Sequence, residues 1–208
     1  MFPSPRRAAF LAATSLPLIL SAAALQQDRA LHDLTDATLR AEIGQLGYYP
    51  ESNGRDTVVP LVHVPLRAWS ERHVEFADAG VRVRIEAQPF HEARWVKHKA
   101  DAYRFEGRPI IGWTVGAEHQ RLSRMEVVLD GHVLDLPVAA FTDLFDPRLC
   151  EPGPTAPLQY ATVARSTDGW RLYVLAQIGE GPEARMVTWV FEDGRYLFRV
   201  VDAFRLSG

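Results

Sequence analysis

The chain has very few of the residues on which several common protein chemistries depend. Cys150 is the only cysteine among 208 residues, so no disulfide can form within one chain. Lys97 and Lys99 are the only lysines. The sequence also lacks a P-loop, a dinucleotide-binding fingerprint and a Gly-x-Ser-x-Gly nucleophile elbow. We therefore expect a core held by packing alone, and the motifs predict no cofactor and no catalytic residue.

Long apolar runs are scarce as well. The most apolar segment, residues 8–20, is shorter than the roughly 20 residues that a helix needs to cross a membrane, so no membrane span is expected. Arg6 and Arg7 precede this segment, and Ala22 and Ala24 follow it in the A-x-A pattern of a signal-peptidase site. This order of charged, apolar and small residues predicts a signal peptide.

The predicted signal peptide covers residues 1–24, which leaves a single β-rich globular domain over residues 25–208. We expect this domain in the periplasm or outside the cell. Cleavage would remove two of the 23 basic residues and none of the 26 acidic ones, leaving a net charge of −5. Nucleic-acid binding is not expected, because it needs a positive surface. The preference for arginine over lysine, with abundant alanine, indicates a GC-rich bacterial genome.

Apolar periodicity predicts a mainly β protein (α+β at most), either an antiparallel β-sandwich or a bent sheet. One N-terminal helix is expected over residues 35–46. There Leu39, Ile43 and Leu46 recur at helical spacing, and Thr35 is placed to cap the start. Strands that alternate with long helices, which would indicate a parallel sheet, do not occur.

Turn residues divide the rest of the chain. Residues 78–80 and Asp130-Gly131 each lie between two alternating segments, so each predicts a hairpin, the second with a type I′ turn. A short helix is expected near residues 138–145, between two prolines. The proline-rich stretch 149–157 is expected to form a connecting loop.

Three apolar segments between residues 170 and 201 predict a C-terminal antiparallel meander. Trp189, on the middle strand, is predicted to point into the core. On the last strand, Tyr196 and Phe198 are expected to share one face, with Arg199 on the other.

His91 and His98 raise the question of a zinc site, because Glu92 follows His91 as in metalloprotease motifs. Those motifs place two histidines one helical turn apart. The separation here is seven residues. On a helix this is about 10 Å along the axis, too far for both rings to bind one ion through bonds of about 2 Å. On a strand, an odd separation puts the side chains on opposite faces. No metal site is predicted.

Trp113, His119 and Arg121 are the candidate binding residues. Gly112 and Gly116 flank Trp113 and allow the backbone to turn sharply, which would place the indole at a loop tip. His119 and Arg121 follow and would supply hydrogen-bond donors. Tryptophan and arginine often anchor interfaces. The alternative is that Trp113 folds back and covers the edge of the core.

The stretch LRAEIGQLGYYPESNG, residues 39–54, resembles the first half of the small peptidoglycan-binding domains, whose repeats contain Leu-x-x-Leu-Gly-Tyr. The resemblance implies cell-wall binding by this segment. It covers sixteen residues, and RDTVVPLVHVPLRAW replaces the second half of the family pattern. The whole chain is therefore not assigned to a family.

These features favour an exported, non-enzymatic binding domain of the bacterial cell envelope, of the inhibitor, immunity or accessory type. Its expected partner is an envelope protein or polymer. The alternative is an envelope hydrolase whose site forms only in the fold, from His91, His98 or His119 with a nearby carboxylate. A concave pocket that holds such a pair would favour the enzyme, whereas an exposed aromatic side chain on an open surface would favour the binding domain.

The predicted export can be tested by measuring the intact mass of the protein recovered from the periplasm or the medium. We expect the mature chain to begin at Leu25, because cleavage after Ala24 satisfies the A-x-A pattern. A membrane-retained precursor that still carries Met1 would contradict the prediction.

Overall fold

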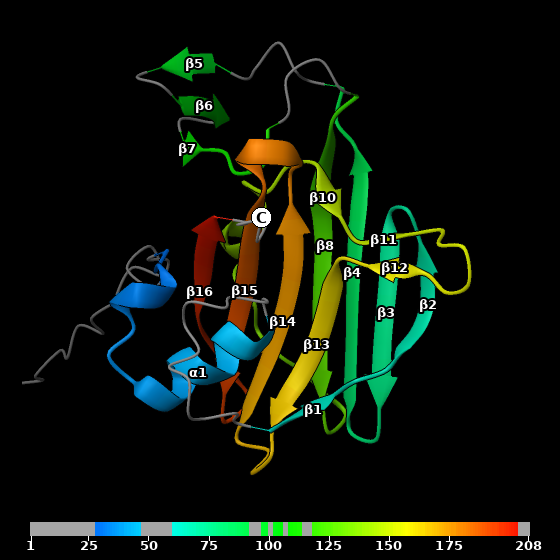
Figure 1. Ribbon diagram of the computed structural model, residues 1–208, viewed down its shortest axis with the longest axis vertical. Coiled ribbons are helices and arrows are strands. Elements are labelled where there is room, and N and C mark those ends of the chain that lie inside the picture. The colour runs from blue at the N-terminus through cyan, green and yellow to red at the C-terminus, as the bar shows by residue number, and fades with distance from the viewer. Residues whose placement is uncertain are drawn as a thin grey trace, which may run out of the picture.

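The computed structural model describes residues 28–46, 60–91, 97–99, 102–105, 108–113 and 118–203. The predicted signal peptide, residues 1–24, lies outside these ranges. Within them the protein is mainly β, with antiparallel sheets and one α-helix, as the sequence predicts (Figure 1). No helix in the described ranges is long and apolar enough to cross a membrane.

Two sheets face each other. The C-terminal sheet has the order β1-β13-β14-β15-β16, with β10 beside β14, and the N-terminal sheet has the order β2-β3-β4-β8-β9. The strands of the C-terminal sheet are β1 (Leu61–His63), β10 (Pro147–Arg148), β13 (Ala161–Ser166), β14 (Arg171–Ile178), β15 (Arg185–Glu192) and β16 (Arg195–Ala203). The strands of the N-terminal sheet are β2 (Leu66–Ser70), β3 (His73–Asp78), β4 (Val81–Pro89), β8 (Gln120–Leu129) and β9 (His132–Val133).

Smaller elements complete the described fold. Beside α1 (Ala37–Leu46) there are three 3₁₀ turns, η2 (Leu31–Asp33), η4 (Val138–Ala140) and η5 (Gly181–Glu183). A separate three-stranded sheet comprises β5 (Lys97–Lys99), β6 (Ala102–Phe105) and β7 (Arg108–Pro109), and a short hairpin pairs β11 (Cys150–Glu151) with β12 (Leu158–Gln159).

The main core lies between the two sheets. Phe76 and Ile85 of the N-terminal sheet and Val174 and Trp189 of the C-terminal sheet belong to one buried cluster. Trp189 has no exposed surface, and its indole nitrogen donates a hydrogen bond of 2.8 Å to the carbonyl of Ala140. The predicted inward orientation of Trp189 is confirmed, because its alternate neighbours on β15 belong to the same cluster.

A second core covers the outer face of the C-terminal sheet. Leu39 and Ile43 of α1 pack there with Tyr173, Leu175 and Val190, and Figure 1 shows the helix beside this sheet. The central strands β14 and β15 are therefore buried on both faces. This explains why β14 is apolar along almost its whole length instead of alternating.

The predicted N-terminal helix is confirmed, but Thr35 does not cap it. The helix begins at Ala37, and the Asp36 carboxylate accepts a hydrogen bond of 3.0 Å from the backbone N–H of Leu39. The same bond lowers the pKa of Asp36. Asp36 holds the cap because its carboxylate also meets the guanidinium of Arg171 on β14, at 3.1 Å.

The predicted hairpins are present. Asp130 and Gly131 have φ angles of 50° and 82°, and Asp193 and Gly194 have 48° and 69°, as the two central residues of a type I′ turn require. The hairpin of residues 78–80 turns through two residues, because Asp78 pairs directly with Val81.

The short helix expected near residues 138–145 is confirmed only over its first turn. Only η4 is helical there, a single 3₁₀ turn that ends at Phe141, where φ is −144°. The chain then extends, and Leu144 and Phe145 form isolated β-bridges to Ile111 and Arg121. These bridges satisfy backbone groups that a longer helix would have paired internally.

The proline-rich stretch 149–157 contains β11 and the turn of a short hairpin, because Cys150 on β11 pairs with Gln159 on β12. Cys150 is buried, and burial raises the pKa of its thiol. A raised pKa leaves less of the reactive thiolate at neutral pH.

The last strand departs from simple alternation. Val190 pairs with Phe198, but Phe191 pairs with Tyr196, so Leu197 forms a β-bulge. Tyr196 therefore packs against the sandwich core while Phe198 packs under the helix, and the expectation that they share a face is wrong. Arg199 lies opposite Phe198 as expected, although that face is the protein interior.

We expect Trp189→Ala to lower the free energy of unfolding by about 3–5 kcal/mol, because it removes a fully buried ring and its hydrogen bond to Ala140. Trp170→Ala is the matched control, since that indole is 50% exposed at a turn, and it should change stability by less than about 0.5 kcal/mol. Chemical denaturation measures both values. Equal losses in the two variants would contradict the assigned strand faces.

Candidate functional site

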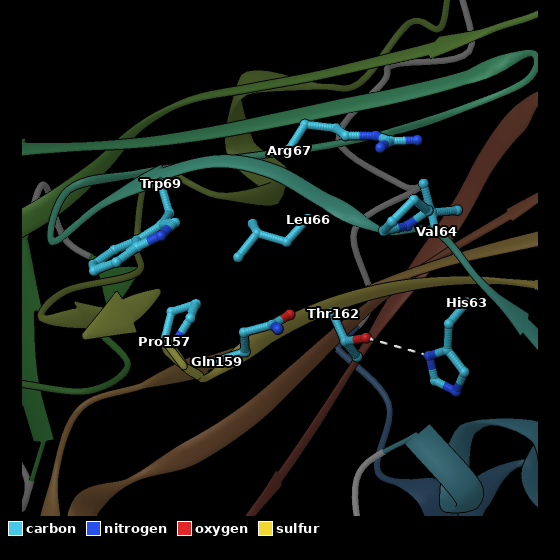
Figure 2. A pocket seen from close by; sticks show the side chains of 9 residues that line it. His63, Val64, Leu66, Arg67, Trp69, Pro157, Gln159 and Thr162 are labelled. Carbon is cyan, nitrogen blue, oxygen red and sulfur yellow. Dashed lines mark hydrogen bonds between the residues drawn. The ribbon is translucent and has the colours of Figure 1, made fainter. Parts of the chain in front are cut away.

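A groove lies at the open side of the sandwich, between β2 and the start of β13. It has a volume of about 610 Å³. Figure 2 shows Leu66 and Trp69 reaching from β2 toward Pro157, Gln159 and Thr162 on the opposite wall. The lining residues are His63, Val64, Pro65, Leu66, Arg67, Trp69, Pro157, Gln159 and Thr162.

The strand register turns Trp69 toward this groove. Trp69 pairs with Val74 and Leu66 with Phe76, both of which point into the core. Directly paired side chains lie on the same face of a sheet, so Leu66 and Trp69 also face the other sheet. Because β2 is the edge strand, the other sheet does not fully cover them, and Trp69 stays 39% exposed.

The opposite wall is polar and comes from two elements. Pro157 and Gln159 belong to the region of the β11–β12 hairpin, and Thr162 lies on β13. The Thr162 hydroxyl lies 3.5 Å from Nδ1 of His63, at the far end of the groove from Trp69 (Figure 2). The groove thus presents an apolar ring at one end and hydrogen-bonding groups along its length.

No acidic side chain appears among the residues that line the described groove. Arg67 lies on its rim, where its Nε donates a hydrogen bond of 2.9 Å to the carbonyl of Ala77. This bond fixes the guanidinium while its terminal nitrogens remain at the exposed surface. The described lining of the groove therefore contains one arginine and no carboxylate, which favours an acidic over a basic group there.

The structure brings the three predicted binding residues together at a different place. The rings of Trp113 and His119 stack with centroids 3.5 Å apart, and Trp113 also packs against Phe145. The guanidinium of Arg121 lies 5.8 Å from the ring centroid of Phe90. Trp113 is partly buried in this cluster, whereas Gly116, which would let it reach a loop tip, lies outside the described residues.

His119 meets a carboxylate, as the hydrolase alternative requires. Its Nδ1 lies 3.0 Å from the Asp146 carboxylate, whose other oxygen accepts a hydrogen bond of 2.9 Å from the backbone N–H of Gln120. Asp146 has φ +50°, so these bonds also hold a turn in a left-handed conformation. The His119 side chain is only 9% exposed beneath Trp113.

A smaller cavity of about 330 Å³ adjoins Asp146, and five carboxylates and one arginine line it. Its cysteine is the buried Cys150 with its raised thiol pKa, and none of its lining residues is a serine, threonine or tyrosine. The lining residues are Glu71, Glu118, Gln120, Asp146, Pro147, Arg148, Leu149, Cys150, Glu151 and Glu180.

The two histidines that raised the question of a zinc site lie in or beside a segment that the structure describes only in part. His91 is exposed, and the side chain of His98 lies outside the description. Within the described residues, no three histidine, cysteine or acidic side chains converge in a way that could hold a metal ion.

Trp69 is not among the binding residues that the sequence predicts. It lies in the segment LRAWSERHVEF, whose alternation indicates a strand and a turn but does not tell an edge strand from a central one. The pairing order of the sheets, which supplies that distinction, arises from contacts between distant segments.

Trp113→Ala is expected to lower the melting temperature and to cost about 1–3 kcal/mol of stability, because the ring stacks on His119 and packs against Phe145. Thermal unfolding followed by circular dichroism measures the change. An unchanged melting temperature would show that Trp113 contributes little to the fold and would favour its predicted role as a binding anchor.

Comparison with known protein families, with curated proteins and with solved structures finds no match to this chain. The functional inference therefore comes from the chain's own residues and their geometry.

Proposed function

We propose that the protein is an exported, non-enzymatic binding domain of the bacterial cell envelope, of the inhibitor, immunity or accessory type. Its recognition site is the groove between β2 and β13. The observation that carries this proposal is Trp69, a large aromatic side chain held partly exposed in a concave site. Aromatic residues in pockets supply much of the binding energy at protein interfaces.

Two further features support the proposal. The N-terminal segment has the layout of a signal peptide, which would deliver the domain to the periplasm or the medium. A core that needs no disulfide would fold there without oxidative assistance. The partner is an envelope protein or polymer, and the cluster at Trp113 stays a second predicted contact.

An envelope hydrolase is the second candidate, and the pair of His119 and Asp146 beside a cavity favours it. A hydrolytic histidine must reach substrate, yet Trp113 stacks on this ring. The cavity also lacks an activated nucleophile among its described lining residues. Asp146→Asn separates the two functions, because a hydrolase that used the His119–Asp146 pair would lose turnover of its envelope substrate whereas a binding domain would keep its partner.

The proposed site can be tested by immobilising the mature protein and passing the solubilised envelope of the source organism over it. We expect Trp69→Ala to reduce the amount of retained partner by about tenfold or more, since it removes the aromatic anchor. Trp170→Ala removes a more exposed indole outside the groove and should retain the partner as the wild type does.

Both variants should unfold at the temperature of the wild type, which separates lost binding from lost folding. Equal retention by wild type, Trp69→Ala and Trp170→Ala would exclude the groove as the recognition site.

A further inference from the structure

We infer that the groove captures its partner by adding an extended, acidic peptide segment to the free edge of β2. This inference rests on the proposed function and names the partner's chemical class. β2 stands at the end of the N-terminal sheet, and within the described residues it pairs only with β3 (Figure 1). Such an edge presents backbone groups that another strand can pair with.

The register shows which backbone groups are available. Ser70 and His73 flank a two-residue turn, and the residues that flank such a turn form a hydrogen-bonded pair. The next pair, Trp69 with Val74, is therefore a non-hydrogen-bonded pair. The N–H and C=O of Trp69 consequently point away from β3, toward the open edge. Trp69 thus contributes its indole ring to the groove, and its backbone contributes one hydrogen-bond donor and one acceptor to an incoming strand.

A strand that paired with this edge would send alternate side chains into the groove. Those side chains would lie between Leu66 and Trp69 on one wall and Pro157 and Gln159 on the other (Figure 2). A volume of about 610 Å³ has room for more than one side chain. The side chains on the other face of the incoming strand would stay in solvent. Every second residue of the partner segment would therefore determine specificity.

Charge complementarity selects an acidic segment. Arg67 stands on the rim, His63 lies at the far end, and no carboxylate lines the described groove. The cavity at Asp146 has the reverse character, with five carboxylates against one arginine. A basic segment would therefore be drawn to that cavity, and an acidic one to the groove.

The bulge in β2 limits the length of the added strand. Leu66 pairs with Phe76 and Ala68 with Glu75, so Arg67 interrupts the ladder. Regular pairing is available only from Ala68 to Ser70. The interaction would consist of a few backbone hydrogen bonds, and the groove side chains would have to supply the remaining affinity.

The test uses a short N-acetylated peptide that alternates valine and glutamate, titrated into isotope-labelled mature protein and followed by NMR. We expect the largest shift at the backbone amide of Trp69, whose N–H faces the open edge, and a smaller one at Ser70, whose N–H faces β3. The same peptide with every second amide N-methylated should bind about tenfold more weakly, because it loses backbone hydrogen bonds on one edge. A version with lysine in place of glutamate should also bind more weakly.

Two variants and a control assign the contacts. Trp69→Ala should weaken binding by about tenfold, and Arg67→Gln by about threefold because its charge is exposed. Arg195→Gln, at an exposed arginine of β16, should bind the peptide as the wild type does. N-methylated and unmodified peptides that bind equally would overturn strand addition, and equal binding of the lysine peptide would overturn the preference for acid.

Other occupants of the groove give different results. If the protein captures an envelope glycan through Trp69 and the peptide does not displace that glycan, this inference is overturned and the proposed function stands. If the protein self-associates as its concentration rises, and Trp69→Ala does not, the edge of β2 binds a second copy of the chain. That result would also overturn the inference of an acidic peptide partner.

Discussion

Arg199 carries its positive charge into the interior of the sandwich, with only 2% of its surface exposed. The guanidinium contacts Asp143 through two hydrogen bonds of 2.6 Å and Asp28 through bonds of 2.6 and 3.0 Å. The carbonyl of Ala140 accepts from both Arg199 and Trp189. A buried ion that loses one partner is strongly destabilising. The interior charge is therefore compensated only when three parts of the chain come together: β16, the loop after η4 and the N-terminal segment.

The same charge network determines how the C-terminal sheet is covered. Asp28 holds the N-terminal segment on β16, where Leu31 donates its N–H to the carboxylate of Asp202. Arg171 then holds α1 through Glu42, at 3.2 Å. With the segment and helix docked, the C-terminal sheet is covered on its outer face as well as in the core. The N-terminal sheet keeps β2 as an edge strand, and Trp69 lies there. The charge network thus covers the outer face and the β16 edge of the C-terminal sheet, and none of its described contacts involves β2.

Local patterns were enough to predict the antiparallel strands, the helix over most of its length and the tight hairpins, because periodicity and turn chemistry act over a few residues. The 3₁₀ turn at η4 and the bulge at Leu197 could not be predicted in this way. The first ends because Leu144 and Phe145 bridge to distant strands, and the second is visible only in the pairing of β15 with β16. The groove is also nonlocal, since its two walls come from β2 and from the region around β12 and β13.

The described tryptophans show why exposure alone does not mark a binding site. Trp170 is more exposed than Trp69, but it occupies the turn before β14 and lines neither described cavity. A partner that covered Trp170 would meet no opposite wall among the described cavities and would leave water in contact with much of the ring. Trp69 already has a wall opposite it, so a bound side chain would be enclosed on two sides. Binding energy rises when water is excluded around an aromatic anchor, which favours the partly buried ring over the more exposed one.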